Sequence, residues 1–227
     1  MDVIRSDDYH DYVILGDRFI GEFEQMYQNC EDPWHQDADG LSEREPLRRI
    51  VLEEIRSLGP KHILDVGCGL GYFTNQLRQH IPGAEVLGTE LSKTAVSKAA
   101  ARYPSCQFQE LDALKLHLLQ KTFDVVVCSE LLWYILGDLN LFFKEVASVS
   151  HEKTSLVFSQ YFPPPEEQRY GRDVIVGVEG FLRLIPFRVV KILEVNRLLS
   201  ANERERQGKT GSHRVLLLCD CLQGQSR

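Results

Sequence analysis

The sequence lacks several features that would assign it to common classes of protein. It has no apolar run near the roughly 20 residues that a membrane-spanning helix needs, so we expect no membrane segment. Basic residues are outnumbered, 26 against 33 acidic ones, and the formal net charge is −7. Proteins that bind duplex DNA or bulk RNA usually carry a basic face, so we do not expect nucleic acid as a partner.

Cysteine is present, but without the spacing of a disulfide framework or a metal site. None of the six cysteines forms a C-x-x-C pair, and Cys68 and Cys128 fall inside apolar segments. Cys219 and Cys221 would share one face of a strand, but no further ligands lie near them in the sequence, so we expect no metal. Reduced thiols, and a polar start over residues 1–8 that does not resemble a signal peptide, favour a cytoplasmic location.

What remains is typical of one folded domain. The chain has 227 residues, of which 43% are hydrophobic, enough for a single core. From residue 62 onward, short apolar segments alternate with helical patterns, which indicates an α/β fold with a doubly wound, parallel sheet and right-handed crossovers. The seven expected strands are residues 62–66, 85–89, 106–110, 123–128, 155–160, 187–195 and 213–221.

Helices are expected between these strands and ahead of them. The connection after residue 195 is short and lacks helical periodicity, so the last strand should run antiparallel to its neighbour. From the expected helices and strands, we divide the chain into a helical N-terminal cap or lid (1–41), a Rossmann-like domain (42–221) and a disordered tail (222–227). The expected helices are residues 16–28, 42–58 (with Ser42 in a capping box), 72–80, 95–101 (capped by Ser92), 139–149 and 178–184.

A glycine-rich turn follows the first strand. It reads Asp65-Val66-Gly67-Cys68-Gly69-Leu70-Gly71. Glycines let the backbone approach a ligand closely, and the start of the next helix offers free N–H groups. Glu90 ends the second strand, 19 residues (90 − 71) after the last glycine, where a carboxylate can accept both hydroxyls of a ribose. Asp112 follows the third strand and, beside the backbone of Ala113, could accept a hydrogen bond from an adenine amino group.

The spacing of the glycines indicates which nucleotide fits. A dinucleotide fold prefers G-x-G-x-x-G, whereas the third glycine here comes one residue early. The loop also holds no arginine or lysine for a phosphate. The expected ligand therefore carries ribose and adenine but no phosphate. Two alternatives to this interpretation stay open. The loop could bind the cofactor of a nicotinamide-dependent oxidoreductase, which the glycine spacing disfavours, or it could be a tight turn that binds no ligand.

These residues resemble the glycine motif and the two acidic positions of the class I S-adenosylmethionine-dependent methyltransferases. The resemblance implies S-adenosylmethionine as cofactor, with the backbone of Gly67 and Gly69 facing its methionine part and Asp65 supporting its ammonium group. The expected cofactor-binding residues are Tyr27, Trp34, Asp65, Gly67, Cys68, Gly69, Gly71, Glu90, Leu91, Asp112, Ala113, Ser129 and Glu130.

A narrower resemblance points to the nodulation protein S group, which methylates the amine of an amino sugar. It rests on Asp32-Pro33-Trp34 and on Ser129-Glu130-Leu131-Leu132-Trp133-Tyr134. The chain departs from the common class pattern before the fifth strand, where residues 150–153 replace the usual Pro-Gly-Gly turn.

Methyl transfer needs an acceptor lone pair held in line with the activated methyl group, and a base when the acceptor is an alcohol. Glu130, just beyond the fourth strand, and His35 are the candidate catalytic residues, and His213 is a weaker candidate base. Glu130 could instead only order its loop, and the aromatic residues could simply pack. The expected substrate-pocket residues are Trp133, Tyr134, Tyr161 and Tyr170.

The sequence therefore predicts an enzyme that methylates a nitrogen or oxygen atom of a small molecule, with an amino sugar or sugar-like metabolite favoured. The alternatives are a protein or peptide methyltransferase and a methyltransferase-like scaffold without activity. The oligomeric state stays open.

Overall fold

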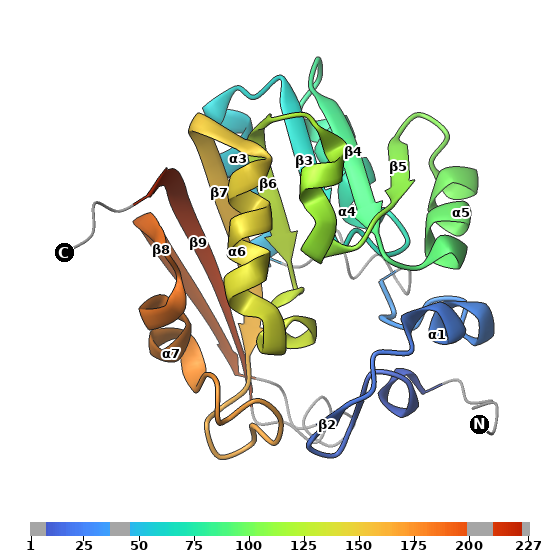
Figure 1. The fold of residues 1–227 in the computed structure, drawn as a ribbon, viewed down its shortest axis with the longest axis vertical. Coiled ribbons are helices and arrows are strands. Elements are labelled where there is room, and N and C mark those ends of the chain that lie inside the picture. Colours follow the sequence, from blue (N-terminus) through green and yellow to red (C-terminus); the bar gives the residue numbers. More distant parts are fainter. Residues whose placement is uncertain (1–7, 37–45, 199–210, 224–227) are drawn as a thin grey trace.

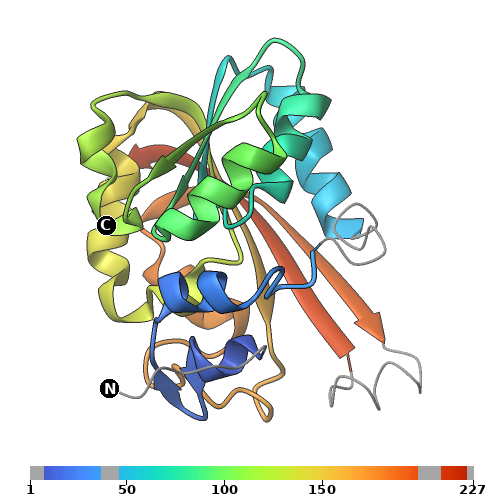
Figure 2. The same cartoon turned by 90° about the vertical axis from the view of Figure 1, so that its right-hand side faces the viewer.

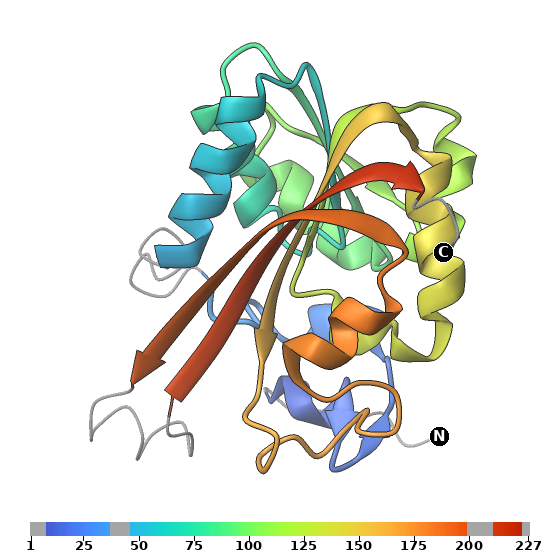
Figure 3. The same ribbon diagram turned by 90° about the vertical axis from the view of Figure 1, so that its left-hand side faces the viewer.

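One seven-stranded sheet organises the chain. The computed structural model describes residues 8–36, 46–198 and 211–223, and its strands follow the order β5-β4-β3-β6-β7-β9-β8 (Figure 1). Strands β3 to β7 are parallel, whereas β9 is antiparallel to its two neighbours, β7 and β8. Figure 3 shows β9 between these two strands. This order confirms the predicted fold class. The strands are β3 (His62–Val66), β4 (Glu85–Glu90), β5 (Gln107–Glu110), β6 (Phe123–Ser129), β7 (Ser150–Phe162), β8 (Phe187–Leu198) and β9 (Gly211–Gln223).

Helices cover both faces of the sheet. One face packs against α3 and α4, and the other against α6, α7 and η3. The apolar residues Leu47, Val51 and Ile55 of α3 recur every four residues, so they form one buried stripe toward the sheet. The helices are α3 (Pro46–Leu58), α4 (Tyr72–His80), α5 (Lys93–Arg102), α6 (Leu139–Ser148) and α7 (Gly177–Leu184), with 3-10 turns η3 (Ala113–Leu119), η4 (Leu132–Tyr134) and η5 (Leu136–Asp138).

The central strand β6 is buried on both faces, as its run of valines predicts. Val125, Val126 and Val127 have at most 1% of their surface exposed. A helix on each side is therefore required to cover them, which is why this strand lies in the middle of a three-layered fold. Its carboxyl end opens toward the loops that hold the candidate site.

The N-terminal segment lies across the carboxyl edge of the sheet (Figures 1 and 2). It consists of η1 (Tyr9–Asp11), a hairpin of β1 (Ile14–Leu15) and β2 (Arg18–Phe19), and α1 (Phe23–Asn29). The predicted helix over residues 16–28 is wrong in its first half. Gly16 and Gly21 have φ of +67° and +76°, and these left-handed turns form and close the hairpin before the helix begins.

Several strand boundaries also differ from the sequence prediction, two of them in segments that were expected to lie outside the sheet. Residues 150–153, expected as a turn, belong to β7, because Ser150 pairs with Phe123 before an irregularity in the ladder. At the other end, β9 continues to Gln223, two residues into the predicted tail, because Gln223 pairs with Phe187. The expected capping box at Ser42 lies outside the described residues.

Removing one buried ring should reveal how much the aromatic core contributes. Phe158 is 5% exposed and contacts the rings of Phe143, Phe181 and Phe187. We expect Phe158→Ala to lower the free energy of unfolding by roughly 3–5 kcal/mol, since it leaves a cavity. Urea denaturation measures the change. Leu118→Ala, at a side chain that is 56% exposed, is the control and should change it by about 0.5 kcal/mol or less; equal losses in both variants would contradict this core.

Candidate functional site

The glycine loop joins β3 to α4 and lies against the end of β4. The backbone N–H groups of Gly67 and Cys68 both donate to the carbonyl of Thr89, at 2.8 and 2.9 Å. Gly71 has φ of +78°, and a Cβ there would lie 2.6 Å from the ring of Phe108. The loop therefore holds a left-handed turn with no room for a side chain at that position.

Glu90 ties this loop to the next one. Its buried carboxylate accepts a hydrogen bond from the backbone N–H of Gly69 at 3.1 Å and another from Ser92 at 3.0 Å. Burial raises the pKa of Glu90, and the backbone hydrogen bonds oppose that rise. A buried carboxylate at the end of β4 can accept the two hydroxyls of a ribose.

Asp65 lies at the same edge, within β3. Its side chain is 2% exposed and accepts a hydrogen bond from the hydroxyl of Thr74 at 2.7 Å. Burial raises its pKa to about 6, while Thr74 and the charge of Arg48 act in the opposite direction. A carboxylate desolvated in this way gains from a positively charged partner, such as the ammonium group of an amino acid.

The third acidic residue, Asp112, follows β5 beside Glu90. Leu111 donates its backbone N–H to the carbonyl of Glu90 at 2.9 Å, so the two strand ends are joined. Asp112 caps η3 by accepting the N–H of Leu114 at 2.9 Å, and Ala113 is the first residue of that turn. Leu91, directly after β4, is 51% exposed.

The N-terminal segment covers the glycine loop with Tyr27. A Cβ on Gly69, whose φ is +54°, would lie 2.9 Å from the Tyr27 hydroxyl, so this position is a cradle that any side chain would fill. The indole N–H of Trp34 donates to that hydroxyl at 2.9 Å. Burial raises the pKa of Tyr27, which keeps its own proton for donation. His35, in contrast, is exposed and its placement offers no support for a role as base.

Glu130 comes directly after Ser129, the last residue of β6, but its carboxylate points along the sheet edge toward β9. It accepts hydrogen bonds from the backbone N–H of Tyr161 at 3.0 Å and the side-chain amide of Gln160 at 3.1 Å. It also pairs with the guanidinium of Arg214 on β9. Because three donors occupy this carboxylate, the geometry favours a role in positioning the loop over proton transfer.

The expected pocket residues fall into two groups. Trp133 donates its indole N–H to the carbonyl of Tyr161 at 2.8 Å, so Trp133 lies beside the carboxyl end of β7, to which Tyr161 belongs. Tyr134 packs against Trp34 with ring centroids 5.7 Å apart, and Tyr170 lies 6.2 Å from the ring of Phe19. Both rings therefore meet the N-terminal segment. His213 is in contact with Glu194 at 2.9 Å on the outer strands.

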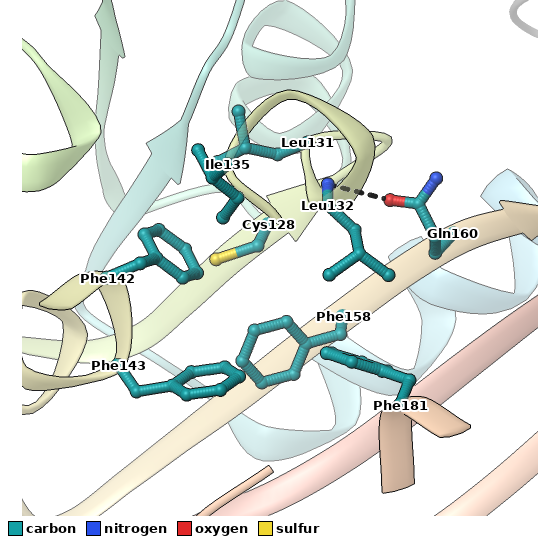
Figure 4. Close-up of a pocket in the computed structure, with 9 residues that line it drawn as sticks. All are labelled: Cys128, Leu131, Leu132, Ile135, Phe142, Phe143, Phe158, Gln160 and Phe181. Carbon is teal, nitrogen blue, oxygen red and sulfur yellow. Dashed lines mark hydrogen bonds between the residues drawn. The ribbon is translucent and has the colours of Figure 1, made fainter. Parts of the chain in front are cut away.

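A small apolar cavity lies behind the η4 turn (Figure 4). Its single hydrogen bond drawn in Figure 4 runs from the backbone N–H of Leu132 to the side-chain oxygen of Gln160, at 3.0 Å. The cavity is on the α6 and α7 side and does not include the glycine loop. It is lined by Cys128, Leu131, Leu132, Ile135, Phe142, Phe143, Phe158, Gln160 and Phe181.

The described residues hold no group of three or more His, Cys, Asp or Glu side chains that could bind a metal ion. No helix within the same residues is long and apolar enough to cross a membrane. Three residues that hold acidic side chains in place were not predicted from the sequence: Thr74, Gln160 and Arg214. Thr74 could have been noticed in the first turn of the helix after the glycine loop, whereas Arg214 reaches Glu130 only through the antiparallel strand order.

Comparisons with known proteins relate part of this chain to methyltransferases. Residues 63–153 match the family described as methyltransferase domain. The demethylmenaquinone methyltransferase of Deinococcus radiodurans is 34% identical over 86 residues, which are 36% of this chain and 36% of that protein. A ubiquinone biosynthesis O-methyltransferase of Coxiella burnetii is 30% identical over 145 residues, which are 62% of this chain and 59% of that protein. The chain thus spans less than two thirds of the length of these curated relatives.

Among solved structures, the N-methyltransferase NodS of Bradyrhizobium japonicum, in complex with S-adenosyl-L-homocysteine, has a similar fold. The TM-score is 0.63 at 17% identity, over 87% of this chain and 98% of NodS. At this identity the likeness concerns the fold. Residues 63–153 thus match a methyltransferase domain, and the chain has a fold similar to that of NodS.

Proposed function

We propose that the chain transfers a methyl group from S-adenosylmethionine to a nitrogen or oxygen atom of a small molecule. The observation that carries this proposal is the buried carboxylate of Glu90, bound to the backbone N–H of Gly69 in the glycine loop. The relatives support it, since their names describe O-methylation in one case and N-methylation in another. The cofactor, when bound, supplies a methyl group that is already activated.

In this proposal each side chain at the carboxyl edge has a separate task. Glu90 accepts the ribose hydroxyls, and Asp65 attracts the ammonium group. Asp112 and the backbone of Ala113 contact the adenine, while Tyr27 covers the methionine part. Residues 1–41 then act as a lid over the domain formed by 42–221, and a lid of this kind excludes water during the transfer.

Aromatic contacts where we expect the methyl acceptor to bind support an enclosed site for a small molecule. The aromatic residues Trp34, Tyr134 and Tyr170 join the N-terminal segment to the loops after β6 and β7. Since the carboxylate of Glu130 is engaged by three donors, an amine fits better than an alcohol, because an unprotonated amine needs no base. We therefore favour the amine of an amino sugar or a similar metabolite as acceptor.

An assay that follows transfer of a labelled methyl group from the cofactor distinguishes this proposal from a protein methyltransferase and from a scaffold without activity. Label in small molecules supports the proposal, whereas label in protein fractions would indicate a protein methyltransferase. Binding of the cofactor without turnover on any acceptor would indicate a scaffold without activity.

Binding of S-adenosylhomocysteine tests the site itself. We expect calorimetry to show binding to the unaltered chain, and Gly69→Arg to weaken it by at least about 100-fold, because the new side chain fills the cradle beside Tyr27. Gly137→Arg is the matched control, since a Cβ there has no neighbour within 4 Å. A folded Gly69→Arg variant that binds as the unaltered chain does would contradict the assignment.

The acidity of Asp65 predicts opposite effects of pH on stability and on binding. The pKa is raised to about 6 from 3.8, so the folded chain holds this proton more tightly than the unfolded one between those values. Asp65 therefore contributes stability at low pH that is lost as the pH rises through about 6. Cofactor binding should strengthen over the same rise, because only the ionised carboxylate attracts the ammonium group.

Both trends should be absent from Asp65→Asn. Urea denaturation and calorimetry with S-adenosylhomocysteine at pH 5 and pH 7 compare the two proteins. If Asp65→Asn kept the same pH dependence of affinity as the unaltered chain, Asp65 would not be the residue that meets the ammonium group.

A further inference from the structure

The helix α1 of the N-terminal segment is fastened to the start of α5 by one carboxylate. Glu24 accepts hydrogen bonds from the hydroxyl of Ser92 at 2.7 Å, from the backbone N–H of Thr94 at 3.1 Å, and from the hydroxyl of Thr94 at 2.5 Å. A negative charge at the N-terminus of a helix is favourable, because free N–H groups and the helix dipole both attract it.

The charge of Glu24 persists at ordinary pH. Desolvation of the carboxylate acts against ionisation, but the hydrogen bonds from Thr94 and Ser92 outweigh it and lower the pKa of Glu24 to about 2, although the residue is exposed. The attachment is therefore not a switch within the range where enzymes work. It acts as a constant link between the lid and the domain.

A second attachment lies just beyond the other end of α1. Lys98 of α5 donates to the carbonyl of Cys30 at 3.2 Å and forms an ion pair with Glu31 at 3.0 Å. Because α1 is held on α5 at both ends, its orientation over the glycine loop is fixed. Tyr27 lies between these two attachments and faces Gly69.

Ser92 connects the attachment to the cofactor site. Its hydroxyl donates to Glu24, while its backbone N–H donates to Glu90 at 3.0 Å. Ser92 thus contacts both Glu24 of the lid and Glu90, the residue proposed to bind the ribose. A shift of α1 would reach Glu90 through Ser92 and Gly69 through Tyr27.

We propose that Glu24 is a positioning residue of the cofactor site, which docks α1 on Ser92 and Thr94 and thereby places Tyr27 over Gly69. This inference rests on the proposed function, since it assigns to the lid a share of the cofactor's affinity. Glu24 itself does not touch the reacting atoms.

The test compares variants on both sides of the contact. Glu24→Gln keeps the shape but removes the charge and one acceptor oxygen, and Thr94→Val removes the hydroxyl. We expect each to weaken binding of S-adenosylhomocysteine by roughly tenfold. The double variant should weaken binding by no more than about a further twofold relative to the single variants, because both changes weaken the same attachment of Glu24 to α5. Glu22→Gln, an exposed carboxylate on the same segment, is the matched control.

Hydrogen exchange separates positioning from general loss of structure. Amides of residues 23–29 should exchange faster in Glu24→Gln, whereas those of α4 should be unchanged. Binding of wild-type strength in folded Glu24→Gln, or fully additive losses in the double variant, would overturn the proposal. If the unaltered chain bound no S-adenosylhomocysteine, the proposed function would fail; exchange that also stayed unchanged in residues 23–29 would then overturn the role of Glu24.

Discussion

The carboxylate of Glu90 holds two loops in one arrangement, and the candidate site depends on it. It accepts N–H groups from Gly69 before α4 and from Ser92 before α5, while burial raises its pKa. Without those bonds, a buried carboxylate would be costly to keep charged. The site is thus stabilised by the same group that is proposed to bind the ribose, and the lid reaches this group through Glu24 and Ser92.

The sheet could be predicted because its signals are local. The run Val125–Val127 indicated burial on both faces, and the glycines after Asp65 indicated the turn into α4. Alternation of strands and helices then left few possible topologies. The prediction of a helix over residues 16–28 was wrong in its first half for an equally local reason, since Gly16 and Gly21 support a hairpin there.

Side-chain partners could not be predicted, because they depend on strand order and on distant segments. Glu130 was expected near the methyl group from its place after β6. Its actual partner Arg214 lies 84 residues away on an antiparallel strand, and this contact turns the carboxylate toward the outer strands. Likewise, Glu24 meets Thr94 across 70 residues, so no sequence spacing marks it as an attachment point. The structure places Glu90 at the end of β4 and Asp112 after β5, and their binding roles stay predictions.

A crystal structure of the chain with S-adenosylhomocysteine is the most direct test of this account. It should show both ribose hydroxyls within hydrogen-bonding distance of the Glu90 carboxylate, with the backbone of Gly69 against the amino acid part and Tyr27 above it. A nucleoside bound elsewhere, for instance in the apolar cavity behind η4, would contradict the assignment of the site.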